Sequence, residues 1–144
     1  MDERFEHMRL ENQLCFPLYA CAKEIVRQYK PLLDPLDLTY TQYIAMMVLW
    51  EKKELSVKEL GEALWLDSGT LTPLLKKLES KGYVARRRNV DDERILLLSL
   101  TDEGRRLRER ASHVPARADC CPGLTPEESD TLYALLYKVL AGLA

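Results

Sequence analysis

The residues of this 144-residue chain best suited to redox chemistry are four cysteines: Cys15, Cys21, Cys120 and Cys121. Their spacing argues against a structural zinc site, because there is no Cys-x-x-Cys pair and the two histidines, His7 and His113, stand apart. The N-terminus is too polar for a signal peptide, and no apolar run is long enough to span a membrane. We therefore expect a cytoplasmic protein, not bound to a membrane, whose thiols are reduced at rest.

Cys15 stands where a helix is predicted to begin. Apolar residues from Leu14 to Tyr29 recur at helical spacing up to a break at Pro31, and Pro17 favours a start close to Phe16. Backbone N–H groups at a helix N-terminus favour the thiolate, which is the reactive form of cysteine. The alternative is a small buried core residue, the usual place of a cysteine outside a disulfide.

A second candidate site is the segment between Leu66 and Val84. One apolar face is predicted by helical spacing of Leu71, Leu74, Leu75 and Leu78. The opposite face is short and polar at first and then cationic, which suits an approach to phosphates and base edges: Ser68, Gly69, Thr72, Pro73 and Lys76. Gly82 is expected to end this helix, and its start fits a cap at Ser68 or at Thr70. The alternative is an ordinary surface helix with a basic side.

The elements around this helix predict a winged helix. Ser56 and Glu59 form a capping box that opens a short helix, and only residues 65–67 separate it from the next one, as in a helix-turn-helix. Residues 83–88 and 95–100 then flank a charged tip and predict a hairpin. A basic hairpin directly after a helix-turn-helix is typical of a wing that lies along DNA.

The rest of the chain predicts one mainly helical domain with a small β-hairpin wing, spanning residues 1–144. Residues 39–50 form a helix for the centre of the core, while residues 14–29 and the apolar stripe after Thr125 and Pro126 are expected at a dimer interface. We assign residues 1–38 and 102–144 to dimerisation and residues 39–101 to a DNA-binding lobe.

The overall charge gives a weaker indication of DNA binding than its distribution does. The formal net charge is −2, whereas dedicated nucleic-acid binders tend to be basic. Between residues 76 and 88, however, six cations face a single acid, Glu79: Lys76, Lys77, Lys81, Arg86, Arg87 and Arg88. The positive charge is therefore local to the predicted helix and wing.

The order of elements and several strings resemble the MarR family of winged-helix regulators over almost the whole chain. These strings are Leu-Thr-Tyr-Thr-Gln-Tyr at 38–43, Thr-Leu-Thr-Pro-Leu-Leu-Lys-Lys-Leu-Glu-Ser-Lys-Gly at 70–82, Asp-Glu-Arg at 92–94 and Leu-Thr-Asp-Glu-Gly at 100–104. Within the family, Glu-Asn-Gln-Leu-Cys-Phe at 11–16 together with Tyr19, Tyr29 and Tyr40 is similar to the branch that senses organic hydroperoxides. The resemblance implies a homodimeric repressor of a peroxidase gene.

The resemblance also implies roles for individual residues. Cys15 is the thiol that peroxide oxidises, and Tyr29 and Tyr40, with Tyr19 nearby, hydrogen-bond it at least partly from the other subunit. In two-cysteine members a resolving cysteine follows near the C-terminal region, a place that Cys120 matches best, with its neighbour Cys121 as the alternative. Cys21 is expected in the core. We expect an apolar surround that suits an alkyl peroxide, formed by Leu14, Phe16, Leu18, Met46 and Met47.

The sequence therefore predicts a repressor that binds palindromic operator DNA when reduced and releases it when Cys15 is oxidised. The expected DNA contacts come from Ser68, Thr70, Thr72, Lys76, Lys77, Arg86, Arg88, Asp92 and Arg94, with Asp92 holding Arg94. Two alternatives are a MarR-type regulator of a small phenolic ligand, with incidental cysteines, and a thiol peroxidase. We expect no enzyme, because the sequence offers no second catalytic constellation, and no cofactor or metal.

Overall fold

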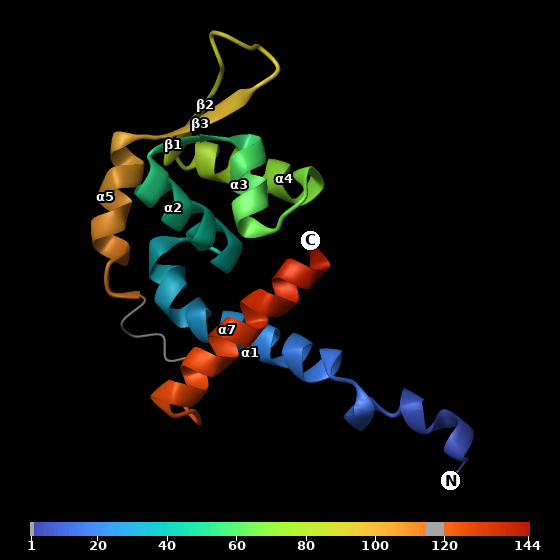
Figure 1. The fold of residues 1–144 in the computed structure, drawn as a ribbon. Helices are drawn as coiled ribbons and strands as arrows, with labels where there is room; N and C mark the ends of the chain where they lie inside the picture. The colour runs from blue at the N-terminus through green and yellow to red at the C-terminus, as the bar shows by residue number, and fades with distance from the viewer. Residues whose placement is uncertain (1, 115–119) are drawn as a thin grey trace.

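The computed structural model describes residues 2–114 and 120–144. Two 3₁₀ helices, η1 (Glu3–Met8) and η2 (Leu10–Asn12), precede α1 (Cys15–Leu33), and η3 (Asp34–Leu36) links α1 to α2 (Tyr40–Lys52). Strand β1 (Glu54–Ser56), α3 (Val57–Leu64) and α4 (Ser68–Ser80) follow. The chain continues with β2 (Val84–Arg88), β3 (Leu96–Leu100), α5 (Asp102–Ala111) and α7 (Pro126–Leu143) (Figure 1). The described chain is mainly helical with a small sheet, as the sequence predicts.

The helix starts follow from local side-chain chemistry. Capping boxes form at Thr39 with Gln42, at Ser56 with Glu59 and at Thr125 with Glu128. Each pair satisfies backbone N–H groups that the first turn of a helix leaves without a helical partner. The capping boxes therefore set the starts of α2, α3 and α7 at the positions that the sequence predicts.

The start of α4 differs from both expected positions. Asp67 is the N-cap, with an extended backbone, and its Oδ1 accepts the Thr70 N–H at 2.8 Å. Aspartate is among the strongest N-cap residues, and this bond outweighs the loss of one helical hydrogen bond at Pro73, which lies inside α4. The prediction of a cap at Ser68 or Thr70 was therefore wrong.

The end of α4 is a Schellman motif, as the glycine at its end suggests. Gly82 has a φ of 82°, its N–H bonds to the Glu79 carbonyl at 3.0 Å, and the Tyr83 N–H bonds to the Leu78 carbonyl at 3.1 Å. The turn delivers the chain directly into β2.

The predicted end of α1 at Pro31 was wrong, because the helix continues to Leu33. A proline in the last turn removes one hydrogen bond there without ending the helix.

The wing is a hairpin inside a three-stranded antiparallel sheet of order β1-β3-β2. Val84 pairs with Leu100 and Arg88 with Leu96, which sets the hairpin register, while Leu55 of β1 pairs with Leu98. The sequence did not reveal β1, because three residues are too few for an alternating pattern. Its Leu55 side chain is buried, so β1 closes one side of the core.

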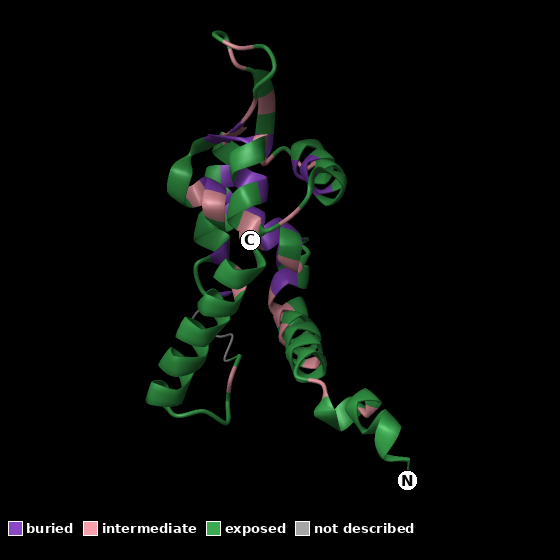
Figure 2. Ribbon diagram, turned by 45° about the vertical axis from the view of Figure 1, so that its right-hand side comes forward, coloured by how far each residue is buried: buried purple, intermediate pink, exposed green. Residues whose placement is uncertain are grey.

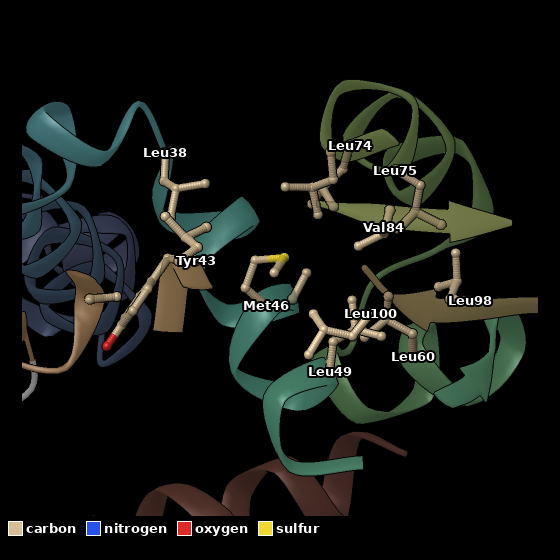
Figure 3. Packing of buried hydrophobic residues seen from close by; sticks show 14 of the residues in the cluster. Leu38, Tyr43, Met46, Leu49, Leu60, Leu74, Leu75, Val84, Leu98 and Leu100 are labelled. Atoms are coloured by element: carbon tan, nitrogen blue, oxygen red, sulfur yellow. The ribbon is translucent and has the colours of Figure 1, made fainter. Parts of the chain in front are cut away.

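The core surrounds α2, as expected for a helix that is apolar around most of its circumference. Met46 and Leu49 are fully buried, and Figure 3 shows them among side chains of α3, α4 and the sheet, including Leu60, Leu75 and Leu98. Burial of each leucine removes it from water at a gain of roughly 1.5–3 kcal/mol. The Trp50 indole donates a hydrogen bond to the Gly104 carbonyl at 2.9 Å and joins α2 to α5.

The N-terminal part of α1 extends away from this core, and α7 forms a second arm whose C-terminal end points back toward the core (Figure 2). No residue of α7, all of which is described, is buried, and its side chains Leu135, Tyr137 and Val139 are about half exposed. Among the described residues, no helix is long and apolar enough to cross a membrane. These apolar arms lie outside the core that stabilises the winged helix.

Gly104 tests the packing of α5 against the sheet. A Cβ at this position would lie 2.3 Å from the Tyr83 carbonyl oxygen and 2.7 Å from Leu100 Cδ1. We expect Gly104→Ala to lower the free energy of unfolding by about 3 kcal/mol, since the backbone of one element must move. Urea unfolding followed by circular dichroism measures this change.

Gly69→Ala is the matched control, because its added Cβ meets Asp67 Oδ1 at an ordinary 3.5 Å. Alanine also favours a helix over glycine by up to about 1 kcal/mol, so this variant should be as stable as the parent or slightly more so. Equal urea midpoints for Gly104→Ala and the parent protein would contradict the close packing of α5.

Candidate functional site

Cys15 is the first residue of α1, and its side chain is exposed. It stands in the first turn, where backbone N–H groups lack helical partners and can donate to an anion. Leu14 at the N-cap has no polar side chain to satisfy these donors. The predicted position of Cys15 at a helix start is confirmed, and the alternative of a buried core cysteine does not hold within this chain.

The surroundings of Cys15 are apolar but open. Leu14 is 78 % exposed, and Phe16 and Leu18 are also exposed. Tyr19, one turn along α1, is exposed too, and the Lys23 ammonium lies 5.8 Å from its ring centroid. The expectation that Met46 belongs to this surround was wrong, because the sequence could not show that its side chain points into the core of the winged helix (Figure 3).

Tyr29 and Tyr40 form an aromatic cluster at the other end of α1. Their ring centroids are 5.0 Å apart. The ring centroid of Tyr43, which was not predicted as a site residue, lies 6.0 Å from that of Tyr29. Burial raises the pKa of Tyr29 and Tyr40, and the charge of a Cys120 thiolate adds to the rise. Both phenols therefore stay protonated and able to donate hydrogen bonds at neutral pH.

Cys120 is therefore near enough to this tyrosine cluster for its charge to act on both phenols. Its Sγ is 3.1 Å from Sγ of Cys121, so the two thiols that the sequence could not rank occupy the same place. Cys120 is exposed and Cys121 is partly buried. Cys21 was expected in the core but is exposed, because the part of α1 that carries it projects from the winged helix.

The length of α1 separates these groups. Cys15 and Tyr29 are fourteen positions apart, which at about 1.5 Å per residue amounts to about 21 Å along the helix axis. A straight helix cannot bring its own ends together, so Tyr29 cannot donate a hydrogen bond to Cys15 of the same chain. Tyr40 packs on Tyr29 and is equally remote. Within one chain, the structure gathers Tyr29, Tyr40 and Cys120 but not Cys15.

The predicted DNA-binding face of α4 is exposed as a single surface. Ser68, Thr72 and Lys76 follow at intervals of four residues and therefore lie in one row on the helix, while Thr70 and Lys77, seven positions apart, lie on the other flank of the exposed face. Burial of Leu71, Leu74, Leu75 and Leu78 on the opposite face fixes this orientation. The Thr72 hydroxyl donates to the Ser68 carbonyl at 2.8 Å, which leaves its oxygen lone pairs facing outward.

Several cations counted from the sequence are paired in the fold. The guanidinium of Arg86 contacts Glu79 at 2.6 Å and lowers the pKa of that carboxyl group, while Arg87 contacts Glu54 at 2.9 Å. Glu54 is distant in sequence and joins the group through β1. The local positive charge is therefore smaller than the sequence count of six cations against one acid indicates.

The wing tip keeps two exposed arginines. The Arg94 side chain is 91 % exposed and contacts Asp92 at 3.0 Å, as predicted, and Asp92 also accepts the Arg94 backbone N–H at 3.1 Å. Arg88 is exposed, and its guanidinium lies 3.4 Å from the Glu93 carbonyl oxygen. Asp92 thus fixes the turn that presents Arg94, while Arg88 stands at the base of the tip.

Comparisons with known proteins agree with this geometry. The family model for the transcriptional regulators SarA and Rot matches residues 27–110, more than half of the chain. The organic hydroperoxide resistance transcriptional regulator of Bacillus subtilis (strain 168) is 48 % identical over 143 residues, covering 99 % of this chain and 97 % of that protein.

Solved structures extend the match to DNA complexes. Reduced AbfR bound to DNA has a TM-score of 0.79 at 34 % identity, covering 99 % of this chain and 98 % of that one. Overoxidized AbfR bound to DNA has a TM-score of 0.77 at 34 % identity over 98 % and 99 %. A MarR variant from E. coli complexed with operator DNA has a TM-score of 0.82 at 29 % identity over 97 % and 99 %. The chain therefore belongs to the MarR family of winged-helix transcriptional regulators, in the branch that contains the organic hydroperoxide resistance regulator.

Proposed function

We propose that this protein is a cytoplasmic, homodimeric repressor that binds a palindromic operator when reduced and releases it when an organic hydroperoxide oxidises Cys15. The observation that carries the proposal is the exposed Cys15 thiol in the first turn of α1. It occurs in a chain 48 % identical to a regulator of organic hydroperoxide resistance, and AbfR, a structural neighbour, has been solved on DNA in reduced and overoxidized forms.

The exposed apolar faces of α1 and α7 support the dimer. Exposed apolar faces of this kind are stable in water when a second surface covers them, and an identical chain offers the same faces. Residues 1–38 and 102–144 supply the dimer contacts in this proposal, and residues 39–101 form the DNA-binding lobe. The single domain of residues 1–144 thus works as half of a symmetric unit.

Dimerisation also completes the redox site. Cys15 of one subunit meets the partner's Tyr29 and the partner's Tyr40, because the helix length keeps the tyrosines of the same chain about 21 Å away. Phenolic hydroxyls that donate to sulfur, together with the helix N-terminus, stabilise the thiolate that attacks the peroxide. Tyr19 lies one turn from Cys15 on its own helix and closes the site from that side. Leu14, Phe16 and Leu18 supply the apolar wall that favours alkyl peroxides.

Oxidation acts on DNA binding through a disulfide to the partner. The sulfenic acid of Cys15 condenses with the partner's Cys120, or with the partner's Cys121 as the alternative, and a disulfide requires alpha carbons within about 7 Å. Drawing the two subunits together at this point rotates the lobes and changes the distance between the two copies of α4. That distance must stay at about 34 Å for both copies to enter successive major grooves.

In the bound state, α4 enters the major groove and the wing follows the backbone. Base edges are read by the short polar side chains Ser68, Thr70 and Thr72, and phosphates are contacted by Lys76 and Lys77. Arg88 and Arg94 lie at the wing, with Asp92 holding Arg94, and Arg86 contributes from its ion pair with Glu79. The cations that remain unpaired lie close together on this surface. The surface can therefore bind DNA although the protein as a whole is mildly acidic.

The role of Cys15 predicts the behaviour of Cys15→Ser. This variant should bind operator DNA as tightly as the reduced parent and keep binding after an organic hydroperoxide is added, because serine cannot form a sulfenic acid. Fluorescence anisotropy with labelled operator, before and after cumene hydroperoxide, measures both states. Cys21→Ser, on the same helix, is the matched control and should release DNA like the parent. Release of DNA by oxidised Cys15→Ser would overturn the proposal.

The role of Lys76 is tested by the salt dependence of binding. Lys76→Ala should weaken binding to specific and non-specific DNA alike and reduce the slope of log K against log salt by about 0.9, because one phosphate contact is lost. Arg105→Ala removes an equal charge from α5, where Arg105 pairs with Asp102, and should leave both quantities unchanged. An unchanged slope in Lys76→Ala would contradict the assignment of α4 to the DNA.

A further inference from the structure

The pair Cys120 and Cys121 offers more than a choice between two resolving cysteines. The two sulfur atoms lie 3.1 Å apart in adjacent residues. A disulfide bond measures about 2.05 Å, so the sulfurs must move about 1 Å closer for a bond to form. Two thiols at this distance form a unit that can give up two electrons together.

We propose that Cys120 and Cys121 are a dithiol relay, in which one thiol forms the disulfide to the partner's Cys15 and the other then displaces it. The inference rests on the proposed redox function and specifies how the oxidised state ends. Cys120 takes the first step because it is exposed, whereas Cys121 is partly buried. The end product is a disulfide between Cys120 and Cys121 of one subunit.

Each step balances. The Cys15 thiolate attacks the organic hydroperoxide, the O–O bond breaks, and sulfenic acid and an alcohol form after proton uptake. The Cys120 thiol displaces water from the sulfenic sulfur and forms the intersubunit disulfide. The Cys121 thiolate then attacks Cys120 Sγ, the bond to Cys15 breaks, and Cys15 leaves as a thiolate. In total one hydroperoxide is reduced to alcohol and water, and two thiols are oxidised.

Proximity decides the second step. Thiol–disulfide exchange requires a thiolate close to the sulfur that is attacked, and Cys121 is held next to Cys120 by the chain itself. Well-placed groups within one molecule react at effective concentrations far above those of free thiols in solution. The displacement by Cys121 is therefore faster than reduction of the intersubunit bond by external thiols.

The disulfide between Cys120 and Cys121 is also easily reduced. Adjacent alpha carbons are about 3.8 Å apart, below the 4.4–6.8 Å range of most disulfides, so the ring is strained and more readily reduced. The relay therefore returns Cys15 to its thiolate form. It moves the disulfide to a place where cellular thiols can reduce it. The covalent link between subunits becomes a transient signal.

The experiment follows the covalent dimer over time after one equivalent of cumene hydroperoxide. Non-reducing gels and peptide mass mapping are applied to the parent, Cys121→Ser and Cys120→Ser. In the parent the dimer band should form and then decay, with a Cys120–Cys121 disulfide and reduced Cys15 as products. In Cys121→Ser the dimer band should persist at least about tenfold longer, because the displacing thiol is missing. In Cys120→Ser the covalent dimer band should not form at the rate seen in the parent. Equal persistence in the parent and in Cys121→Ser would overturn the relay.

A second arm separates the relay from the redox function itself. Cys15→Ser treated with diamide should lose two hydrogens in the peptide that holds Cys120 and Cys121, since this bond needs no peroxide sensor. Absence of that disulfide overturns the relay and leaves the sensor role of Cys15 intact. Loss of operator binding by Cys15→Ser on hydroperoxide treatment overturns the proposed function instead, and the diamide result then still reports whether the vicinal bond forms.

Discussion

The rigid length of α1 is the constraint on which the rest of this structure depends. One end of the helix is anchored in the core through Leu33, which is 1 % exposed, and the other end carries Cys15 into solvent. Backbone hydrogen bonds hold the two ends about 21 Å apart, so the thiol and the tyrosines cannot meet within one chain. In the proposed function a second subunit completes the redox site, so dimerisation and the chemistry of Cys15 depend on each other.

The connector that follows the anchored end of α1 is hydrogen-bonded to the end of α4. Lys81, directly after α4, donates hydrogen bonds to the Asp37 carbonyl and to Gln42 Oε1, the latter at 3.1 Å. Gln42 is 3 % exposed, and its Oε1 also accepts the Thr39 N–H in the capping box of α2. The ends of η3, α2 and α4 thus share one polar contact. These bonds link the connector that follows α1 to the end of α4.

Ion pairs leave some cations of α4 and the wing unpaired and neutralise others. Arg86 and Arg87 pair with Glu79 and Glu54, and these exposed or half-exposed ion pairs contribute little to stability. Their effect is to hold the wing against α4 and β1 while Lys76 and Lys77 stay exposed on the helix. The net charge of −2 is compatible with DNA binding because the unpaired cations are concentrated on one surface.

Local chemistry in the sequence determined most of the elements. Capping boxes at Thr39, Ser56 and Thr125, the glycine after α4 and the alternating strands of the wing act within a few residues, so their outcome can be read without the fold. The three-residue β1, the cap at Asp67 and the burial of Met46 escaped, because a short strand, two competing caps or the direction of one side chain depends on neighbours. Only the tertiary structure brought Cys120 near Tyr29 and Tyr40, paired Glu54 with Arg87, and kept Cys15 apart from Tyr29 and Tyr40. These relations join residues far apart in the chain, and packing, which spacing along the sequence does not encode, decides them.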